Sequence, residues 1–556
     1  MKFRLMMVAT TLIASTGVRG AVRPQSQLQT KHSARAEGAR TNEASDKRPL
    51  KEYFHPTEMR SIGQVTVGGQ VISYDAIAGT LVVHAKDWED TDTVELDAGI
   101  KSTDPKAGEK NAPKPEASMF YTAYFKQGAA TASRPITFLF NGGPGSSTVW
   151  LRMGAFGPIR VITADGRHTS APYSIVDNAY SLLDASDLVF IDAPGTGFSR
   201  IAGKDKEKSF YGVDQDIDAF TKFITQFLTK YGRWSSPKYV FGESYGTMRG
   251  AGLALSLQKA DVDLNGLILL SDILNWDFMP DDPQLNPGID TPYIVALPTY
   301  AATAWYFSKA PNRPPNLAAY LEDVEQFATT EYALALAKGN ALPQAERARI
   351  AERLAAFTGL PVTYILKSNL RIEYGAFQKE LLQTTGQTTG TLDTRFLGAT
   401  LDPLSKVASY DPQSAAISAA YLGAWHDYVR NRLRYEPGIE YKSGISIYSK
   451  WDYKHQPPGA DKPLIMLPNV LPDLAAAMKQ NPSLKVMVNG GYFDVSTPYF
   501  EGKMEMRHLP VPRSLLGNVE YHYYPSGHMV YVHEPTLIEL HANVVDFIRR
   551  SQPSRN

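Results

Sequence analysis

Hydrophobic positions form four short, nearly continuous runs in the first half of the chain. The runs lie at residues 136–140, 188–191, 239–241 and 267–270. Runs of this kind are typical of strands that are buried on both faces of a parallel sheet. Between the second and the third run, apolar residues recur every three or four positions from Val213 to Leu228, as in an amphipathic helix packed on a sheet. Strand, helix and strand alternate, which predicts a parallel α/β sheet.

Other strand patterns precede these runs and return near the C-terminus. Residues 64–125 alternate apolar and polar positions in short stretches, which predicts antiparallel strands and hairpins. Residues 484–488 and 519–524 predict two further strands, and residues 537–549 predict a closing helix. We therefore expect the end of the chain to complete the sheet.

The long middle of the chain, residues 276–469, has a different pattern. It is rich in Ala, Leu, Tyr and Arg, with helical spacing of apolar residues at 317–338, 343–357 and 415–434. We interpret it as a mostly helical insertion, called the cap below. An insertion at this point can cover the carboxyl ends of the strands, where α/β sheets place their ligands. The predicted core then consists of residues 56–275 and 470–556, on either side of the cap.

The first residues have the layout of a secretory signal peptide. Lys2 and Arg4 precede an apolar run over residues 5–13, and small residues follow. A membrane anchor is the alternative, but this run is too short to span a bilayer, and no later segment reaches the necessary apolar length. We expect a signal peptide at residues 1–20, a disordered spacer at residues 21–55, no stable membrane insertion, and a secreted or periplasmic protein.

Composition excludes several classes of function. With 43% hydrophobic and 21% charged residues, the chain has the composition of an ordinary globular protein. The formal net charge is +0 and no long basic run occurs, so the electrostatic signature of a nucleic-acid binder is missing. The chain has no cysteine, which excludes disulfides and thiol chemistry, and no His-Glu-x-x-His run. We expect no metal and no cofactor, and the oligomeric state stays open.

A glycine-rich run, Asn-Gly-Gly-Pro-Gly-Ser-Ser at residues 141–147, directly follows the first predicted parallel strand. Gly, Pro and Ser are the usual residues of a turn, so the run can be read as a turn alone. Glycines at the end of a buried strand also let backbone N–H groups approach a substrate closely, and a developing oxyanion needs donors of that kind. Both readings stand at this point.

A second run, Gly-Glu-Ser-Tyr-Gly at residues 242–246, lies between a predicted strand and a predicted helix of small residues at 248–257. A nucleophile elbow requires this context, because a tight strand-to-helix turn lifts a serine hydroxyl clear of the sheet. Ser244 also lies at the start of the helix, whose dipole favours an attacking alkoxide. Ser244 is therefore the candidate nucleophile.

A serine nucleophile needs a histidine base and a carboxylate that fixes the histidine tautomer, and in α/β-hydrolases these follow in the order Ser, acid, His. His528 lies in a glycine-containing loop just after the strand predicted at residues 519–524. Asp494 follows the strand predicted at residues 484–488, and its alternative role is an Asx turn or a helix cap. Surface or core roles are expected for the remaining histidines downstream of the serine, which are His426, His455, His508, His522, His533 and His541.

These motifs occur in an order that resembles the serine carboxypeptidase family. The set includes Asp-Ala-Pro-Gly-Thr-Gly-Phe-Ser at residues 192–199 and Gly-His-Met-Val at residues 527–530. The resemblance covers about residues 121–275 and 484–549. It implies an α/β-hydrolase fold, which has a central, mostly parallel sheet and a helical cap insertion.

The resemblance also implies roles for single residues. Ser244, Asp494 and His528 would form the catalytic triad, and the backbone N–H groups of Gly143 and Tyr245 would form the oxyanion hole.

It further implies a binding site for the end of a peptide. Asn141 and Glu243 would hydrogen-bond the free C-terminal carboxylate, and Met529 would line the pocket for the departing residue. A glutamate beside a substrate carboxylate requires a proton shared between them, so we expect binding to weaken as the pH rises.

Three positions depart from the family pattern. A second Glu of the carboxylate-binding set falls at Ala155, and the usual Trp two positions before the Asn is Leu139. The usual Cys of the glycine run is Ser146. The first two departures affect specificity and the third affects stability.

The sequence therefore predicts an exported serine carboxypeptidase, a protease that hydrolyses C-terminal bonds of a peptide substrate through an acyl-enzyme. An esterase or acyltransferase on the same scaffold is the alternative, because a fold does not settle the substrate and Ala155 weakens the peptide-end signal. A non-catalytic binding protein that retains the pocket is a third hypothesis.

Overall fold

The computed structural model describes residues 53–86, 114–311 and 313–552. The predicted signal peptide and nearly all of the predicted spacer lie outside the described residues. Within the described ranges, no helix is long and apolar enough to cross a membrane.

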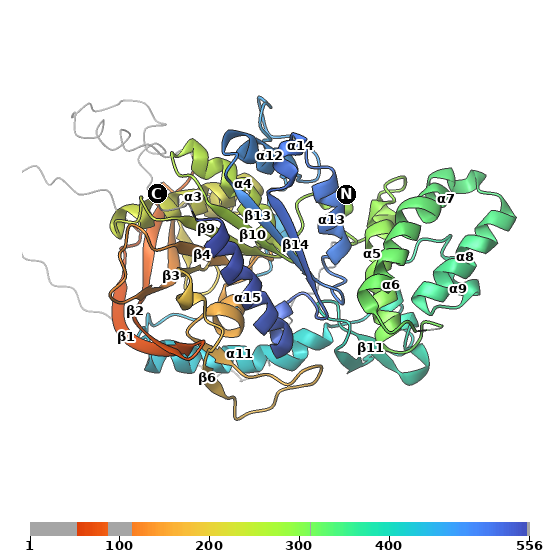
Figure 1. Ribbon diagram of the computed structural model, residues 1–556, viewed down its shortest axis with the longest axis horizontal. Coiled ribbons are helices and arrows are strands. Elements are labelled where there is room, and N and C mark those ends of the chain that lie inside the picture. The colour runs from red at the N-terminus through yellow and green to blue at the C-terminus, as the bar shows by residue number, and fades with distance from the viewer. Residues whose placement is uncertain (1–52, 87–113, 312, 553–556) are drawn as a thin grey trace, which may run out of the picture.

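A ten-stranded sheet forms the centre of the molecule (Figure 1). Nine strands follow one another in space in the order β1, β2, β3, β7, β4, β9, β10, β13, β14, and β8 pairs with β3. Strands β1, β2, β3 and β7 are antiparallel to their neighbours in this order, whereas β7 through β14 run parallel. The bounds are β1 Glu58–Val67, β2 Gln70–His84, β3 Glu116–Lys126, β4 Ile136–Phe140, β7 Asp187–Ile191, β8 Arg200–Ala202, β9 Lys238–Glu243, β10 Gly266–Leu270, β13 Lys485–Gly491 and β14 Val519–Tyr524. This mostly parallel sheet with helices on its faces confirms the predicted α/β-hydrolase fold.

Helices cover both faces of the sheet. Because successive residues of a strand point to opposite sides, each strand contacts both layers of helices. On β4, Phe138 and Phe140 pack in one core cluster with α3, α4 and α12. Leu139, between them, packs in a second cluster with α11 and α15. Burial of one such side chain contributes about 1.5–3 kcal/mol, so both helical layers are held by the strands themselves. The five helices are α3 Val213–Lys230, α4 Tyr245–Lys259, α11 Pro412–Asn431, α12 Leu471–Gln480 and α15 Glu534–Arg550.

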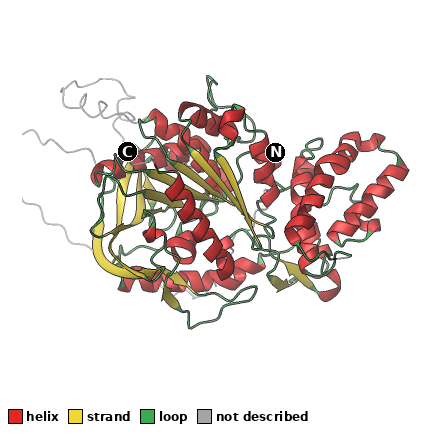
Figure 2. Ribbon diagram, viewed as in Figure 1, coloured by secondary structure: helices red, strands yellow, loops and turns green. Residues whose placement is uncertain are grey.

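Helices α5 to α10 form an almost entirely helical lobe beside the sheet, with a hydrophobic core of its own (Figures 1 and 2). Phe493 and Phe500, from the segment that follows β13, join this core and attach the lobe to the sheet. Helix α11 lies in the range predicted for the cap but packs on the sheet. The lobe contains α5 Thr291–Tyr306, α6 Leu317–Phe327, α7 Ala333–Lys338, α8 Gln344–Thr358, α9 Val362–Lys367, α10 Tyr374–Glu380 and the hairpin of β11 Gln387–Thr389 and β12 Leu397–Ala399.

Most predicted elements are present with small differences in their bounds. The strands predicted at residues 136–140 and 519–524 coincide with β4 and β14. The helix predicted at residues 317–338 is divided, because the π-helical segment η7, Ala328–Tyr332, separates α6 from α7. The remaining elements are β5 Ile159–Val161, β6 Ile175–Asp177, α2 Lys206–Phe210, α13 Tyr499–Arg507, α14 Arg513–Leu516, and short helical turns that include η3 Leu151–Phe156 and η11 Val530–Val532.

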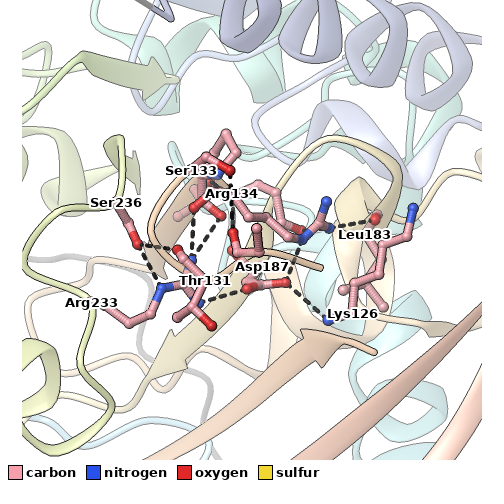
Figure 3. Close-up of polar contacts among 12 residues, drawn as sticks. Lys126, Thr131, Ser133, Arg134, Leu183, Asp187, Arg233 and Ser236 are labelled. Carbon is pink, nitrogen blue, oxygen red and sulfur yellow. Dashed lines mark hydrogen bonds and ion pairs between the residues drawn. The ribbon is translucent and has the colours of Figure 1, made fainter. Parts of the chain in front are cut away.

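A buried charge network ties the strands together at the edge where the parallel strands begin (Figure 3). Asp187, the first residue of β7, accepts hydrogen bonds from Arg134 Nε at 2.6 Å and from Arg233 Nη1 at 2.6 Å. Arg233 also donates to Ser236 Oγ at 2.7 Å, and Ser236 donates to the carbonyl of Thr131 at 2.8 Å. The network joins the starts of β4, β7 and β9, and leaves the opposite edge of the sheet for chemistry.

Candidate active site

Ser244 lies at a sharp turn between β9 and α4, at the carboxyl edge of the sheet. Its backbone has φ 61° and ψ −134°, a region that a residue with a side chain adopts at a cost of about 1–3 kcal/mol. The turn is tight enough that a Cβ on Gly242 would lie 2.1 Å from the carbonyl oxygen of Gly246. The two glycines of the motif are therefore required by packing, and the turn presents the serine as an elbow does.

The glycine run at residues 141–147 lies against the start of α4. A Cβ on Gly142 would lie 2.4 Å from the backbone nitrogen of Tyr245, so only glycine allows this approach. Gly143 has φ 108°, a conformation that favours glycine. Among the described residues, neither the Gly143 N–H nor the Tyr245 N–H has a hydrogen-bond partner. Two free donors therefore lie beside Ser244, as an oxyanion hole requires.

Two side chains hold the run in place by hydrogen bonds to its carbonyls. Arg249, on α4, donates to the carbonyl of Asn141 at 2.8 Å and is itself paired with Asp216 of α3 at 2.7 Å. Tyr448 donates to the carbonyl of Gly143 at 3.2 Å. The carbonyls of Asn141 and Gly143 are thereby fixed by side chains from α4 and from the loop at residues 443–448.

His528 and Asp494 are in direct contact. His528 Nδ1 lies 2.7 Å from Asp494 Oδ2, and both residues are buried. Because an ionised carboxylate only accepts, Nδ1 carries the proton and Nε2 is left as the basic nitrogen. Burial lowers the pKa of His528, but the charge and hydrogen bond of Asp494 outweigh it, and the pKa is raised above its ordinary value.

Asp494 also forms an Asx-type turn, the structural role considered for it from the sequence. Its Oδ1 accepts from the backbone N–H groups of Ser496 at 2.9 Å and Thr497 at 3.1 Å, and the Thr497 hydroxyl donates to Oδ2 at 2.8 Å. The Asx-type turn and the contact with His528 therefore coexist, because each uses different lone pairs. These bonds fix the carboxylate in front of the histidine.

One cavity of about 270 Å³ collects the candidate residues. Ser244, His528 and Asn141 line it, together with Glu243 and Met529. Within the described part of the chain the Ser244 hydroxyl makes no hydrogen bond, and Ser244 and His528 line the same cavity. Other walls come from the range predicted for the cap, and these include the loop at residues 443–448, helix α11, Asp281 and Tyr374.

Glu243 is an unusual group for such a cavity, because its side chain is only 2% exposed. Burial raises its pKa to about 7, although nearby His528, the Tyr531 hydroxyl and the Asn141 amide act in the opposite direction. The Tyr531 hydroxyl lies 2.8 Å from Glu243 Oε2 and 3.2 Å from Oε1. Glu243 is consequently neutral in acid and ionises around neutral pH.

The two departures from the family pattern lie outside the cavity wall. Leu139 is buried within the sheet, where it pairs with Phe190 and Phe241 on the neighbouring strands. Ala155 is buried in η3, and its carbonyl accepts from Asn178 Nδ2 at 2.7 Å. Neither position brings a polar group to Glu243, and the nearest hydroxyl partner is Tyr531, which the sequence motifs did not indicate.

His455 has a structural role away from the cavity. It is buried between Asp214 and Asp473, at 2.6 Å and 2.8 Å, and its pKa is raised to about 9 because these two hydrogen bonds outweigh the effect of burial. The ion pairs attach the long loop at residues 432–470 to α3 and α12. Among the described residues, no group of three or more His, Cys, Asp or Glu side chains could hold a metal ion.

Comparison with known proteins relates part of the chain to one family. The serine carboxypeptidase family matches residues 107–269, which include the glycine run and Ser244 but end before Asp494. The pheromone-processing carboxypeptidase KEX1 of Yarrowia lipolytica is 33% identical over 140 residues, which is 24% of this chain and 21% of that protein. The human retinoid-inducible serine carboxypeptidase is 30% identical over 149 residues, which is 26% of this chain and 30% of that protein. These matches span less than a third of the relatives' length.

Solved structures of low identity cover more of the chain. A carboxyl esterase of Bacillus coagulans is 11% identical, with a TM-score of 0.34 over 86% of this chain and 99% of that one. A proline iminopeptidase of Mycobacterium smegmatis is 14% identical, with a TM-score of 0.32 over 78% of this chain and 96% of that one.

Proposed function

Because residues 107–269 relate this chain to the serine carboxypeptidase family, we propose that it is an exported serine carboxypeptidase that hydrolyses C-terminal peptide bonds. The observation that carries the proposal is that one cavity holds an elbow serine, a histidine paired with a buried carboxylate, and a second buried carboxyl that is neutral in acid. The first two features serve acyl transfer and the third serves recognition of the peptide end.

In the proposed reaction Ser244 Oγ attacks the scissile carbonyl while His528 Nε2 takes its proton. The N–H groups of Gly143 and Tyr245 receive the developing oxyanion. His528 then gives the proton to the departing amino group, and a water molecule hydrolyses the acyl-enzyme by the reverse sequence. Asp494 holds the histidine tautomer and stabilises its charged form.

The substrate's free carboxylate is proposed to bind Asn141 and Glu243, with the side chain of the departing residue against Met529. Two ionised carboxylates in contact repel each other, so Glu243 must hold a proton when the substrate binds. With a pKa of about 7, it does so in acid and loses the proton as the pH rises. Binding therefore weakens with rising pH, in the direction expected from the sequence.

The test is to compare N-blocked dipeptides that have a free or an amidated C-terminus. The proposal predicts strong preference for the free acid below pH 7. Equal turnover of both substrates would exclude carboxylate recognition, and with it the carboxypeptidase assignment.

A second candidate function is an esterase or acyltransferase on the same scaffold. It is favoured by Ala155, which occupies the position of the second Glu in the family's carboxylate-binding set. It predicts hydrolysis of simple activated esters with little release of amino acids from peptides. A non-catalytic binding protein would in turn leave Ser244 unlabelled by a fluorophosphonate probe.

Export is part of the proposal and rests on residues 1–20. The expected destination is a secreted or periplasmic one, without stable membrane insertion. Mass spectrometry of the N-terminus of the secreted protein tests this, because a retained Met1 would contradict removal of a signal peptide.

A further inference from the structure

Tyr531 contacts Glu243 but is not among the described residues that line the cavity. It belongs to η11, three residues after His528, and its side chain is 2% exposed. Its hydroxyl reaches both oxygens of Glu243, at 2.8 Å and 3.2 Å. The loop that carries the histidine therefore also carries the partner of the recognition carboxyl.

The surrounding chain is shaped to admit this side chain. Element η11 packs against η3, and a Cβ on Gly154 of η3 would lie 2.8 Å from the ring of Tyr531 and 2.3 Å from the hydroxyl of Tyr421. Gly154 thus makes room for two tyrosines beneath the cavity. Within the described part of the chain, Tyr421 makes no hydrogen bond to Glu243 and serves as a matched control.

We propose that Tyr531 is a positioning residue for Glu243, whose hydroxyl donates to one carboxyl oxygen and leaves the other to present its proton to an anionic group of the substrate. A tyrosine hydroxyl has one proton, and while it is donated to one oxygen, the acid proton of Glu243 belongs on the other. The proton is then directed to the substrate rather than to the protein. This inference rests on the proposed function.

The groups that face Glu243 set the sign of the pH effect. His528, when charged, and the Tyr531 and Asn141 hydrogen bonds lower the pKa of Glu243, whereas burial and the charge of Asp494 raise it. The buried hydroxyl of Tyr421 also lies near enough to feel the charge of Glu243. Because Tyr531 stabilises the ionised form, its removal raises the pKa of Glu243 further. A Tyr531→Phe enzyme should therefore keep carboxylate binding to higher pH than the natural enzyme.

The experiment measures kcat/KM for an N-blocked dipeptide acid and for a matched ester from pH 4.5 to 9, in natural enzyme, Tyr531→Phe and Tyr421→Phe. At pH 5 the loss of the orienting bond should raise KM for the acid about 2- to 10-fold. In Tyr531→Phe the alkaline fall of kcat/KM for the acid should move up by about one pH unit. This leaves about half of the pH 5 activity at pH 8, instead of about a tenth in the natural enzyme. The ester profile and the Tyr421→Phe profile should not move.

The same measurement in a Glu243→Gln enzyme separates this effect from a general loss of packing. The Glu243→Gln profile should have no alkaline fall in kcat/KM for the acid, and adding Tyr531→Phe should not change the shape of that profile. An alkaline fall that stays in place or moves down in Tyr531→Phe overturns the inference, as does an equal fall in acid and ester turnover at every pH.

A direct titration keeps the inference separate from the proposed function. Difference infrared spectra of natural enzyme against Glu243→Gln report the protonation of this one carboxyl without any substrate. Equal turnover of free and amidated dipeptides would refute the carboxypeptidase, yet the titration midpoint should still rise in Tyr531→Phe. An unchanged midpoint would refute the role of Tyr531 even in an active carboxypeptidase.

Discussion

Replacement of Glu243 by Gln changes the recognition carboxyl without changing its shape. Glu243 has a pKa of about 7 and is 2% exposed. At pH 5 about 99% of it is protonated, and at pH 8 about one part in eleven, so kcat/KM for a peptide acid should fall about tenfold between these pH values. Glutamine stays neutral throughout, and this fall should disappear in the variant.

The size of the loss at pH 5 follows from the hydrogen bond to the substrate carboxylate. A bond to a charged group contributes about 1.5–3 kcal/mol, and the amide restores part of it, so we expect a loss of about tenfold for peptide acids. Esters without a carboxylate should lose less than about twofold.

The assay is kcat/KM for the N-blocked dipeptide acid and its matched ester at pH 5 and pH 8. The acid-to-ester ratio should drop in the variant at pH 5 and converge with that of the natural enzyme at pH 8. An unchanged ratio at pH 5, or an alkaline limb that persists in the variant, would refute the shared proton.

Three further predictions concern the triad, the buried acids and the charge network. Asp494→Asn should lower kcat by about 10³–10⁴-fold with little change in KM, because the histidine loses its tautomer; a fall below tenfold in steady-state assays would argue against a catalytic Asp494. Burial and the charges of Glu505 and Asp272 raise the pKa of Glu501 well above its ordinary value, and neither of its oxygens has a hydrogen-bond partner among the described residues. The folded state therefore holds a proton that the unfolded chain releases, so the free energy of unfolding declines as the pH rises above the ordinary carboxyl range. In calorimetry, Glu501→Gln should raise Tm at pH 8 and leave it unchanged at pH 4. A Tm that changes at pH 4 but not at pH 8 would contradict this prediction. Arg233→Met should lower the free energy of unfolding in urea by about 3–5 kcal/mol, because it leaves part of the buried Asp187 charge uncompensated. The control Arg430→Met removes an exposed ion pair and should change the free energy of unfolding by less than about 1 kcal/mol. Equal effects of the two variants would contradict the role of burial.

The parallel core could be predicted because its signals are local. Strands β7 and β10 contain continuous apolar runs at residues 188–191 and 267–270, and the glycines around Ser244 reflect distances under 3 Å that no other residue allows. The pairing of His528 with Asp494 was expected from the order Ser, acid, His, from the position of each residue after a predicted strand, and from the family resemblance. These features depend on few residues, each close in sequence to a strand end.

Other features depend on contacts between distant segments and left no local pattern. The bond from Tyr531 to Glu243 joins residues 288 positions apart, and neither residue's neighbours indicate the other. A surface or core role was expected for His455, and it is buried, but the sequence did not indicate its contact with Asp214, which lies 241 positions away. Helix α11 shows the same limit, since its amphipathic pattern predicts a helix but not that the helix packs on the sheet.

We propose that this site cleaves peptides by recognising a free C-terminal carboxylate. The most direct measurement is the ratio of kcat/KM for an N-blocked dipeptide acid to that for its C-terminal amide at pH 5. We expect a ratio of about 10² or more, because the amide lacks the charge that Asn141 and protonated Glu243 bind. A ratio near one would contradict it.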